Sequence, residues 1–415
     1  AAVDWQQRLF TVPRLPRVLP SLMSFAILVL AVGAGFLSTP DPLENILPLL
    51  VWTGFWVAFT LLTALLGNLW PWLNPWTGPL RLTSRLSGRS LGRQPIVRLP
   101  ERLGYLAAII QFLVFAWYEL VSLAPDNPDA LALAVTLYWL FNFAMMVIFG
   151  EAEWMRRAEP FSVFFRLVGM MSPFVAKPSR IRPGRLDIRL QWPGRLCLDH
   201  ASLTPSGIVF VVLTLAAVSF DGFSRTFAWF MLIGVNPLEF EGRSQVQLAN
   251  SLGLAGAVLV LMALYMAAVW AGCRLVGVRS GSTFLRLAGL FVLSLLPISI
   301  AFHASHYLTV LLVNGQYLLA ALSDPFASGI DLFGTAGRHV TTSFLANLED
   351  VTLIWQFQTA VIVTGHIVGI AIAHAIAVRH FSSVRQAVLS QSFLALGMVG
   401  FTVFGLWLLS TLSTG

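Results

Sequence analysis

Charged residues are scarce in this chain: they make up 11% of its 415 residues, while 57% are hydrophobic. Ordinary soluble domains carry about a quarter charged residues. A soluble protein of this length buries at most about three quarters of its surface, so it could not cover so much apolar side chain. The composition excludes a water-soluble globule, a disordered chain and a collagen-like one.

Cysteine and lysine are scarce as well. Cys197 and Cys273 are the two cysteines, and they form no CxxC pair, so neither a disulfide framework nor a thiolate metal site is indicated. Lys177 is the single lysine among 26 basic residues, and we attach no function to that bias. In a soluble protein, the net charge of +7 would suggest binding to nucleic acid. In a membrane protein, the distribution of basic residues among the loops has to be considered first, and we expect no nucleic-acid partner.

Long apolar runs are abundant, and nine are long enough to cross about 30 Å of hydrocarbon as helices. They cover approximately residues 18–38, 46–67, 104–124, 130–149, 205–220, 248–272, 285–312, 352–378 and 387–412. The first run also fits a signal peptide, but it is long for one, and we expect it to be retained. The pattern predicts an all-α polytopic membrane protein.

Basic residues alternate sharply between the connections. If nine spans are threaded, 23 of the 26 fall on one side, and the other side keeps only Arg225, Arg243 and Arg338. The positive-inside rule then places the N-terminus in the cytoplasm and the C-terminus outside. This sorting, rather than nucleic-acid binding, accounts for the basic charge.

We divide the chain into residues 1–149 with four helices, a basic cytoplasmic connection over 150–204, and residues 205–415 with five helices. Within the connection, residues 176–204 alternate polar and apolar side chains around two Pro-Gly pairs, which predicts a short cytoplasmic β-ribbon. Its arginines would meet anionic lipid headgroups. In the hairpin NLWPWLNPW, we expect the tryptophans to anchor at the membrane interface.

Four of the seven histidines lie inside apolar segments, where ionisable side chains are costly and usually face a protein interior. Counted from flanking arginines, His303, His306, His366 and Glu119 lie about 20–30 Å from the cytoplasmic side, in the outer half of the bilayer. His374 lies only about 8 Å in. The remaining three, which we expect to be solvated, are His200, His339 and His380.

His303 and His306 are three residues apart and share one helix face, so both can reach one metal ion. His366 would add a third imidazole, and Glu119 a fourth ligand, a partner of a ligand, or a base. Imidazole suits copper, zinc or iron. The spacing therefore predicts a transition-metal centre.

Other interpretations of these residues stay open. One b-type haem could lie between His306 and His366, whereas two stacked haems are excluded because His303 and His306 are about one helical turn apart. The histidines are also compatible with structural roles, each bonded to a neighbouring hydroxyl or carbonyl. Glu119 is equally compatible with snorkelling to the outer interface, and we favour a structural, helix-end role for His374.

Beyond His306 the chain stays apolar to Leu322, which overshoots the bilayer when counted from Arg286. Part of this run must project outside, lie flat or re-enter. A glycine-rich loop follows it, over residues 323–339, and could form a lid over the site. We expect an ordinary extracellular loop there.

The stretch FHASHYLTVLLVNGQYLLAALSDPF, the later DLFGT and TGHIVGIAIAHAIA, and the NLWPWLNPW hairpin resemble a group of bacterial multi-pass proteins labelled fenitrothion hydrolase-like. The match covers chiefly residues 300–375 and the hairpin. The resemblance implies membrane-associated cleavage of an organophosphate triester. It also implies that the family's histidine set consists of His303, His306, His366 and His374, which adds His374 to the candidate metal ligands.

We therefore predict a protein of the bacterial inner membrane with a histidine-rich metal centre in the outer half of the bilayer, acting as a metal-dependent hydrolase or oxidoreductase. One alternative is a single-haem protein that exchanges electrons with quinone. Another is a carrier of copper or a related metal. The expected partners are the lipid bilayer and a periplasmic or membrane protein that exchanges electrons or metal with it.

Overall fold

The computed structural model describes residues 5–236, 239 and 242–411. The chain forms two compact units, each assembled from three segments that are separate in the sequence. The first unit comprises Ala1–Leu103, Ala124–Pro193 and Thr309–Ser343. The second comprises Gly104–Leu123, Gly194–Leu308 and Phe344–Gly415. These units follow packing rather than chain order, so they do not coincide with the three stretches into which the sequence was divided.

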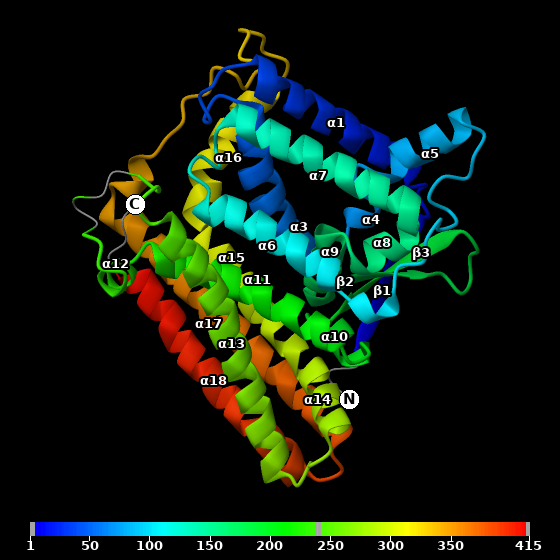
Figure 1. The fold of residues 1–415 in the computed structure, drawn as a ribbon, viewed down its shortest axis with the longest axis vertical. Coiled ribbons are helices and arrows are strands. Elements are labelled where there is room, and N and C mark those ends of the chain that lie inside the picture. Colours follow the sequence, from blue (N-terminus) through cyan, green and yellow to red (C-terminus); the bar gives the residue numbers. More distant parts are fainter. Residues whose placement is uncertain (1–4, 237–238, 240–241, 412–415) are drawn as a thin grey trace. The chain divides into compact units, whose positions relative to one another are not determined.

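In the first unit, the long helices α1 and α7 run side by side, and α5 packs against α1 (Figure 1). Its helical elements are α1 (Val18–Leu37), α2 (Ile46–Pro48), the π-helix η2 (Leu49–Phe59), α3 (Thr60–Leu66), α4 (Trp70–Leu73), α5 (Thr77–Leu86), η3 (Glu101–Leu103), α7 (Pro128–Phe149), α8 (Glu151–Arg157), α9 (Pro160–Val168), η4 (Gly169–Met171) and α16 (Leu308–Ser323). The short turn η6 (Ser343–Leu345) lies at the point where the chain returns to the second unit.

In the second unit, α17 packs against both α15 and α18, and α13 lies alongside α18 (Figure 1). Its helices are α6 (Leu106–Val121), α10 (Arg195–Asp199), α11 (Pro205–Ser224), α12 (Phe227–Leu232), α13 (Gln247–Leu275), α14 (Gly281–Phe291), the 3-10 turn η5 (Val292–Leu295), α15 (Leu296–His306), α17 (Leu348–His380) and α18 (Val384–Ser410). Helix α11 is buried along most of its length, so it forms the core of this unit.

Eight helical segments in the described part of the chain are long and apolar enough to cross a membrane. They are Val18–Leu37, Ile46–Leu66, Pro128–Phe149, Pro205–Ser224, Gln247–Leu275, Gly281–His306, Leu348–His380 and Val384–Ser410. This confirms an all-α polytopic membrane protein. The orientation of these helices in the bilayer remains a prediction, and Leu412, the last residue of the ninth predicted segment, lies outside the described residues.

Two of the predicted segments differ from the structure. The segment 104–124 forms the 16-residue helix α6, about 24 Å long and therefore short for a full crossing. The prediction that 285–312 is one span is wrong, because that helix ends at His306 and Tyr307 leaves the helical conformation before α16 begins. Hydropathy stays high across Tyr307, so composition does not indicate the break.

Helix starts follow local capping signals. Asn127, Thr204 and Asn347 each accept a hydrogen bond from a backbone N–H in the first turn of α7, α11 and α17. Proline follows the cap at the start of α7 and α11, where its missing N–H costs nothing. These residues set where the long helices begin.

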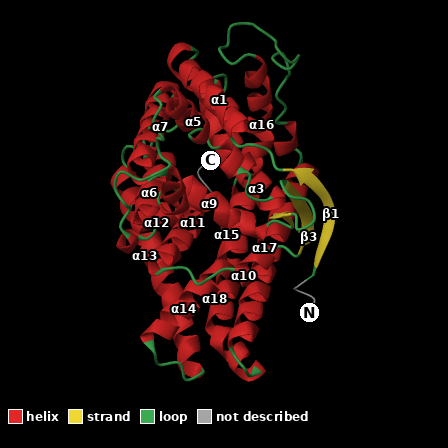
Figure 2. Cartoon of the chain, turned by 90° about the vertical axis from the view of Figure 1, so that its right-hand side faces the viewer, coloured by secondary structure: helices red, strands yellow, loops and turns green. Residues whose placement is uncertain are grey.

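The predicted β-ribbon is confirmed as an antiparallel pair of strands, β2 (Phe174–Pro178) and β3 (Arg185–Gln191). The structure adds a third strand, β1 (Gln6–Pro13), which pairs with the other edge of β3 (Figure 2). Thr11 on β1 donates a hydrogen bond to Asp187 on β3. The polar N-terminal segment did not predict this strand.

Two of the three hairpin tryptophans, Trp70 and Trp76, are buried, which corrects for them the expectation of an interfacial anchor; Trp72 stays partly exposed. Trp70 and Trp76 are 7% and 2% exposed and lie in the core of the first unit. The indole of Trp70 donates to Glu159 and Ser162, and that of Trp76 to the carbonyl of Trp139. These buried acceptors satisfy the indole N–H groups, so the rings do not need the interface.

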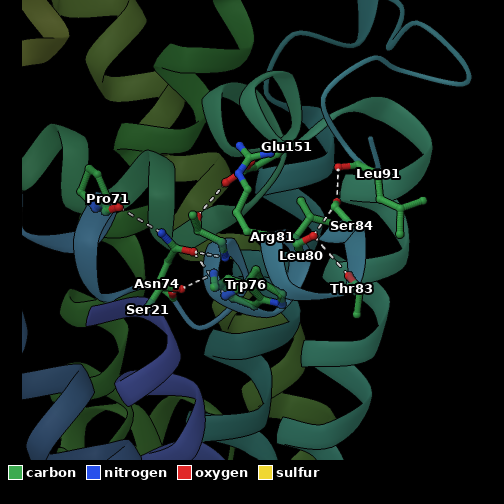
Figure 3. Close-up of polar contacts among 12 residues, drawn as sticks. Ser21, Pro71, Asn74, Trp76, Leu80, Arg81, Thr83, Ser84, Leu91 and Glu151 are labelled. Atoms are coloured by element: carbon green, nitrogen blue, oxygen red, sulfur yellow. Dashed lines mark hydrogen bonds and ion pairs between the residues drawn. The ribbon is translucent and has the colours of Figure 1, made fainter. Parts of the chain in front are cut away.

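Polar contacts hold the chain around this hairpin (Figure 3). Ser21 on α1 donates to the carbonyl of Asn74 at 2.5 Å and accepts from the N–H of Gly78 at 2.7 Å. Glu151 at the start of α8 pairs with Arg81 on α5. These bonds tie α1 and α8 to the short helices α4 and α5.

Candidate functional site

A polar cluster lies where three helices of the second unit end. Glu119 stands near the end of α6, Asp221 near the end of α11, and His306 is the last residue of α15. Tyr307 follows directly, at the break in the chain. On the predicted topology these helix ends lie toward the outer side.

The hydroxyl of Tyr307 joins the two carboxylates of the cluster. It lies 2.9 Å from Oε1 of Glu119 and 2.9 Å from Oδ2 of Asp221. A phenol carries one proton and can donate to one acceptor at a time. If it donates to one carboxylate, the other contact needs a proton on the carboxyl group itself, so the pair is suited to hold an extra proton.

Asp221 is the most densely bonded member of the cluster and is 1% exposed. Its Oδ2 lies 2.7 Å from Nε2 of His306, and its Oδ1 accepts from Arg225 at 2.8 and 3.0 Å. An ionised carboxylate only accepts hydrogen bonds, so His306 presents Nε2–H to it. Arg225 is four residues along the same chain segment and supplies the counter-charge.

A second arginine closes the end of α6. Arg243 donates to the backbone carbonyls of Glu119 at 3.0 Å and Ser122 at 3.2 Å. These are among the last carbonyls of the helix, which lack partners within it. Arg243 thereby secures the backbone that carries the Glu119 side chain.

His303 lies one turn before Tyr307 and is buried, at 4% exposed. Its ring centroid is 4.8 Å from that of Tyr307, the same separation as between Tyr307 and His306. The predicted pair of histidines therefore borders one tyrosine ring. Of the two, His306 takes part in the hydrogen bonding to Asp221.

His366, the third predicted ligand, lies on α17 against Phe302 and Phe401, with ring centroids 6.1 and 6.3 Å away. Its Nδ1 donates to the carbonyl of Ile362 at 2.8 Å. Its Nε2 is buried and has no hydrogen-bond partner among the described residues. His366 is not among the side chains that bond to Asp221.

His374 lies farther along α17, and its side chain is exposed. Its Nδ1 is 2.6 Å from the amide nitrogen of Gln391 on α18. This contact agrees with the structural role considered for His374. The residue does not join the polar cluster.

In the part of the chain that the structure describes, no group of three or more histidine, cysteine, aspartate or glutamate side chains is placed to hold a metal ion. Glu119 and His306 are connected indirectly: Glu119 bonds to Tyr307, Tyr307 to Asp221, and Asp221 to His306. The metal centre thus stays a prediction.

Sequence reasoning missed Asp221 and Tyr307 of the cluster, and Arg225, which pairs with Asp221. The fifth apolar segment was expected to end near residue 220, which placed Asp221 and Arg225 in an external loop, whereas α11 continues to Ser224 and includes Asp221. An Asp and an Arg four residues apart at the end of an apolar run form an i,i+4 pair, and that spacing was the available signal.

No protein-family model, curated protein or solved structure matches this chain.

Proposed function

We propose that this membrane protein binds and releases protons at the cluster of Glu119, Tyr307, Asp221 and His306 and thereby passes them across the membrane. The observation that carries the proposal is the single tyrosine hydroxyl at 2.9 Å from two carboxylates. Chains of carboxylates and histidines within membrane helices commonly act as proton relays.

The charges around the cluster limit where a proton can be held. With both carboxylates ionised and His306 neutral, Glu119 and Asp221 carry two negative charges, which Arg225 at Asp221 and Arg243 at the backbone of Glu119 offset. The proton can reside on Glu119 or on His306, and Tyr307 connects the two by way of Asp221.

Proton flux tests this proposal. The protein is reconstituted into liposomes that contain a pH-sensitive dye, and a pH gradient is imposed. Tyr307→Phe and Glu119→Gln should reduce proton flux to the level of protein-free liposomes, because each interrupts the chain of hydrogen bonds. Asp350→Asn, at the start of α17 and outside the cluster, is the matched control and should retain flux.

Infrared difference spectroscopy between high and low pH gives an independent measurement on the same samples. A carboxyl C=O band should titrate in the wild type and disappear in Glu119→Gln, whereas Asp221→Asn should shift the pH at which it titrates. Wild-type flux in Tyr307→Phe, together with a carboxyl band that none of these substitutions changes, would refute the proposal.

A transition-metal centre is the second candidate, and the supporting observation is the arrangement of His366. Its Nδ1–H is held by the Ile362 carbonyl, which directs the lone pair of the buried Nε2 away from the helix. Histidine ligands usually hold their other ring nitrogen in this way. His366, His303, His306 and Glu119 would then bind copper, zinc or iron. The hydrolase or oxidoreductase activity would depend on that bound metal.

Metal analysis and an absorption spectrum of the purified protein test this second candidate. Stoichiometric metal that is lost in His366→Ala and kept in His380→Gln would support the centre. A Soret band would instead indicate b-type haem, and metal-dependent uptake into liposomes would indicate a carrier. Hydrolysis of an organophosphate triester that requires the bound metal would support the resemblance. We retain the bacterial inner membrane as the proposed location.

A further inference from the structure

A second polar site lies in the second unit, formed by the second half of α14, the end of α17 and residues 198–202. It is a cavity of about 350 Å³. Its principal lining side chains are His200, Arg286, Leu290, Ile376, Arg379 and His380. None of these belongs to the cluster of Glu119, Tyr307, Asp221 and His306, so this site is independent of the proposed proton binding.

The rim of this cavity is basic. Arg286 makes no side-chain hydrogen bond or ion pair with any described residue. Arg379 donates to the carbonyl of Leu198 at 2.9 Å and lies 3.3 Å from Asp199. Asp199 is also paired with Arg195 at 2.6 Å, so this one acid does not balance the arginines around it.

Two imidazoles complete the rim. Nδ1 of His380 is bonded to the carbonyl of Ile376 at 2.9 Å, and Nδ1 of His200 to the carbonyl of Ala201 at 2.6 Å. Each ring therefore keeps its Nε2 side available, and a protonated ring would donate from it. Together with the guanidinium groups, these donors suit a phosphate group.

The inner wall of the cavity is apolar. Leu290 and Ile376 line it and are 6% and 2% exposed. A small soluble anion would gain nothing from contact with this apolar wall. An amphiphile, in contrast, has a charged group for the basic rim and apolar carbons for the wall. The cavity lies along the first three turns of the span Gly281–His306 and at the end of α17, and on the predicted topology both are in the cytoplasmic half of the bilayer, where basic pockets bind lipid headgroups.

We infer that this cavity binds the phosphate headgroup of an anionic phospholipid, with the lipid's first acyl carbons against Leu290 and Ile376. Basic pockets between membrane helices recognise anionic headgroups through the same combination of charge and apolar contact. Arg286 contributes most to specificity, because no residue of the described chain competes for its guanidinium group.

Native mass spectrometry of the protein in detergent tests this inference, with phosphatidylglycerol and phosphatidylcholine as probes. Phosphatidylglycerol should bind more tightly, and Arg286→Gln should weaken its binding by about fivefold to tenfold. Arg279→Gln is the matched control, an exposed arginine just before α14 that does not line the cavity. Because Arg286 makes no internal side-chain bond, its replacement should leave the fold intact.

Two results would overturn the assignment. One is phosphatidylglycerol binding in Arg286→Gln that equals the wild type. The other is inorganic phosphate competing with phosphatidylglycerol at equal affinity, which would mean that the acyl chains add nothing. His380→Gln provides a second variant, and weaker phosphatidylglycerol binding in it would support the inference.

Discussion

Tyr307 connects the polar cluster from its position directly after the last residue of α15. Its N–H still bonds to the carbonyl of His303 at 3.1 Å, but its backbone no longer continues α15. The side chain therefore projects toward α11 and α6 and meets Asp221 and Glu119. A continuous helix through residue 312, as hydropathy suggests, would not require this conformation.

The first prediction concerns the Tyr307 hydroxyl. Tyr307→Phe removes the hydroxyl that bonds to the buried Asp221 and the half-buried Glu119, and losing a hydrogen bond to a charged group costs about 1–3 kcal/mol. We expect a lower melting temperature of the protein in detergent. Tyr317→Phe is the control, since the Tyr317 hydroxyl has no hydrogen-bond partner among the described residues. Equal melting temperatures for the two variants would contradict the prediction.

At the scale of helices, close backbone approach decides how α13 packs on α18. A Cβ atom placed on Gly272 of α13 would lie 2.0 Å from the carbonyl oxygen of Ser390 on α18. Small residues at such crossings let membrane helices approach closely. Gly256 lies on the same helix, and a Cβ there would meet no atom within 4 Å.

These two glycines form a matched pair for the second prediction. Gly272→Ala should destabilise the protein by about 1–3 kcal/mol, because one of the two backbones must move. Gly256→Ala should be neutral or slightly stabilising, since alanine loses less conformational freedom on folding than glycine. Thermal unfolding of both variants checks the sign, and a decrease of equal size in both would show that the crossing is not the cause.

The loop after α16 is held by two aspartates. Asp331 accepts hydrogen bonds from Ser323 Oγ and from the N–H groups of Thr335 and Ala336, which lowers the pKa of its carboxyl below the usual range. The N–H of Ser328 lowers the pKa of Asp324 in the same way. Because the ionised forms accept these bonds, their contribution is complete above about pH 4 and is lost as pH falls through the lowered pKa values.

The third prediction tests the Asp331 contacts at neutral pH. Asp331→Asn imitates the protonated carboxyl and weakens its bonds to the loop. Trypsin should then cleave after the exposed Arg338 faster than in the wild type. Asp350→Asn, outside the loop, should leave the cleavage rate unchanged. The assignment fails if the Asp331 variant is cleaved at the wild-type rate.

For the whole molecule, the segregation of basic residues predicts which loops face the cytoplasm, and cysteine labelling can test it. The native thiols do not interfere, because Cys197 and Cys273 are 0% and 2% exposed. Burial raises the pKa of Cys197 to about 12, so its reactive thiolate is scarce at neutral pH.

The fourth prediction uses single cysteines introduced at two exposed positions, Ser90 and Thr342. A membrane-impermeant maleimide applied to intact cells should label Thr342→Cys, whereas Ser90→Cys should react after the membrane is opened. Labelling of both positions in intact cells, or the reverse pattern, would contradict the predicted orientation.

The amino-acid sequence was sufficient to predict most of the membrane helices and the β2–β3 ribbon, because hydropathy, alternation and Pro-Gly turns are local properties of the chain, but it did not predict the helix end at His306. It also identified Glu119, His303, His306 and His366 as the residues to examine, since polar groups in apolar runs stand out without any structure. The function assigned to them remains a proposal.

Tertiary packing alone revealed which of these residues meet. The partner of His306 is Asp221, 85 positions away, and the partner of Glu119 is Tyr307, where the helix breaks. Trp70 and Trp76 of the hairpin are buried because their indole N–H groups find buried acceptors. Contacts between distant segments depend on how helices pack, and packing depends on shape and on paired hydrogen bonds that no local pattern of residues encodes.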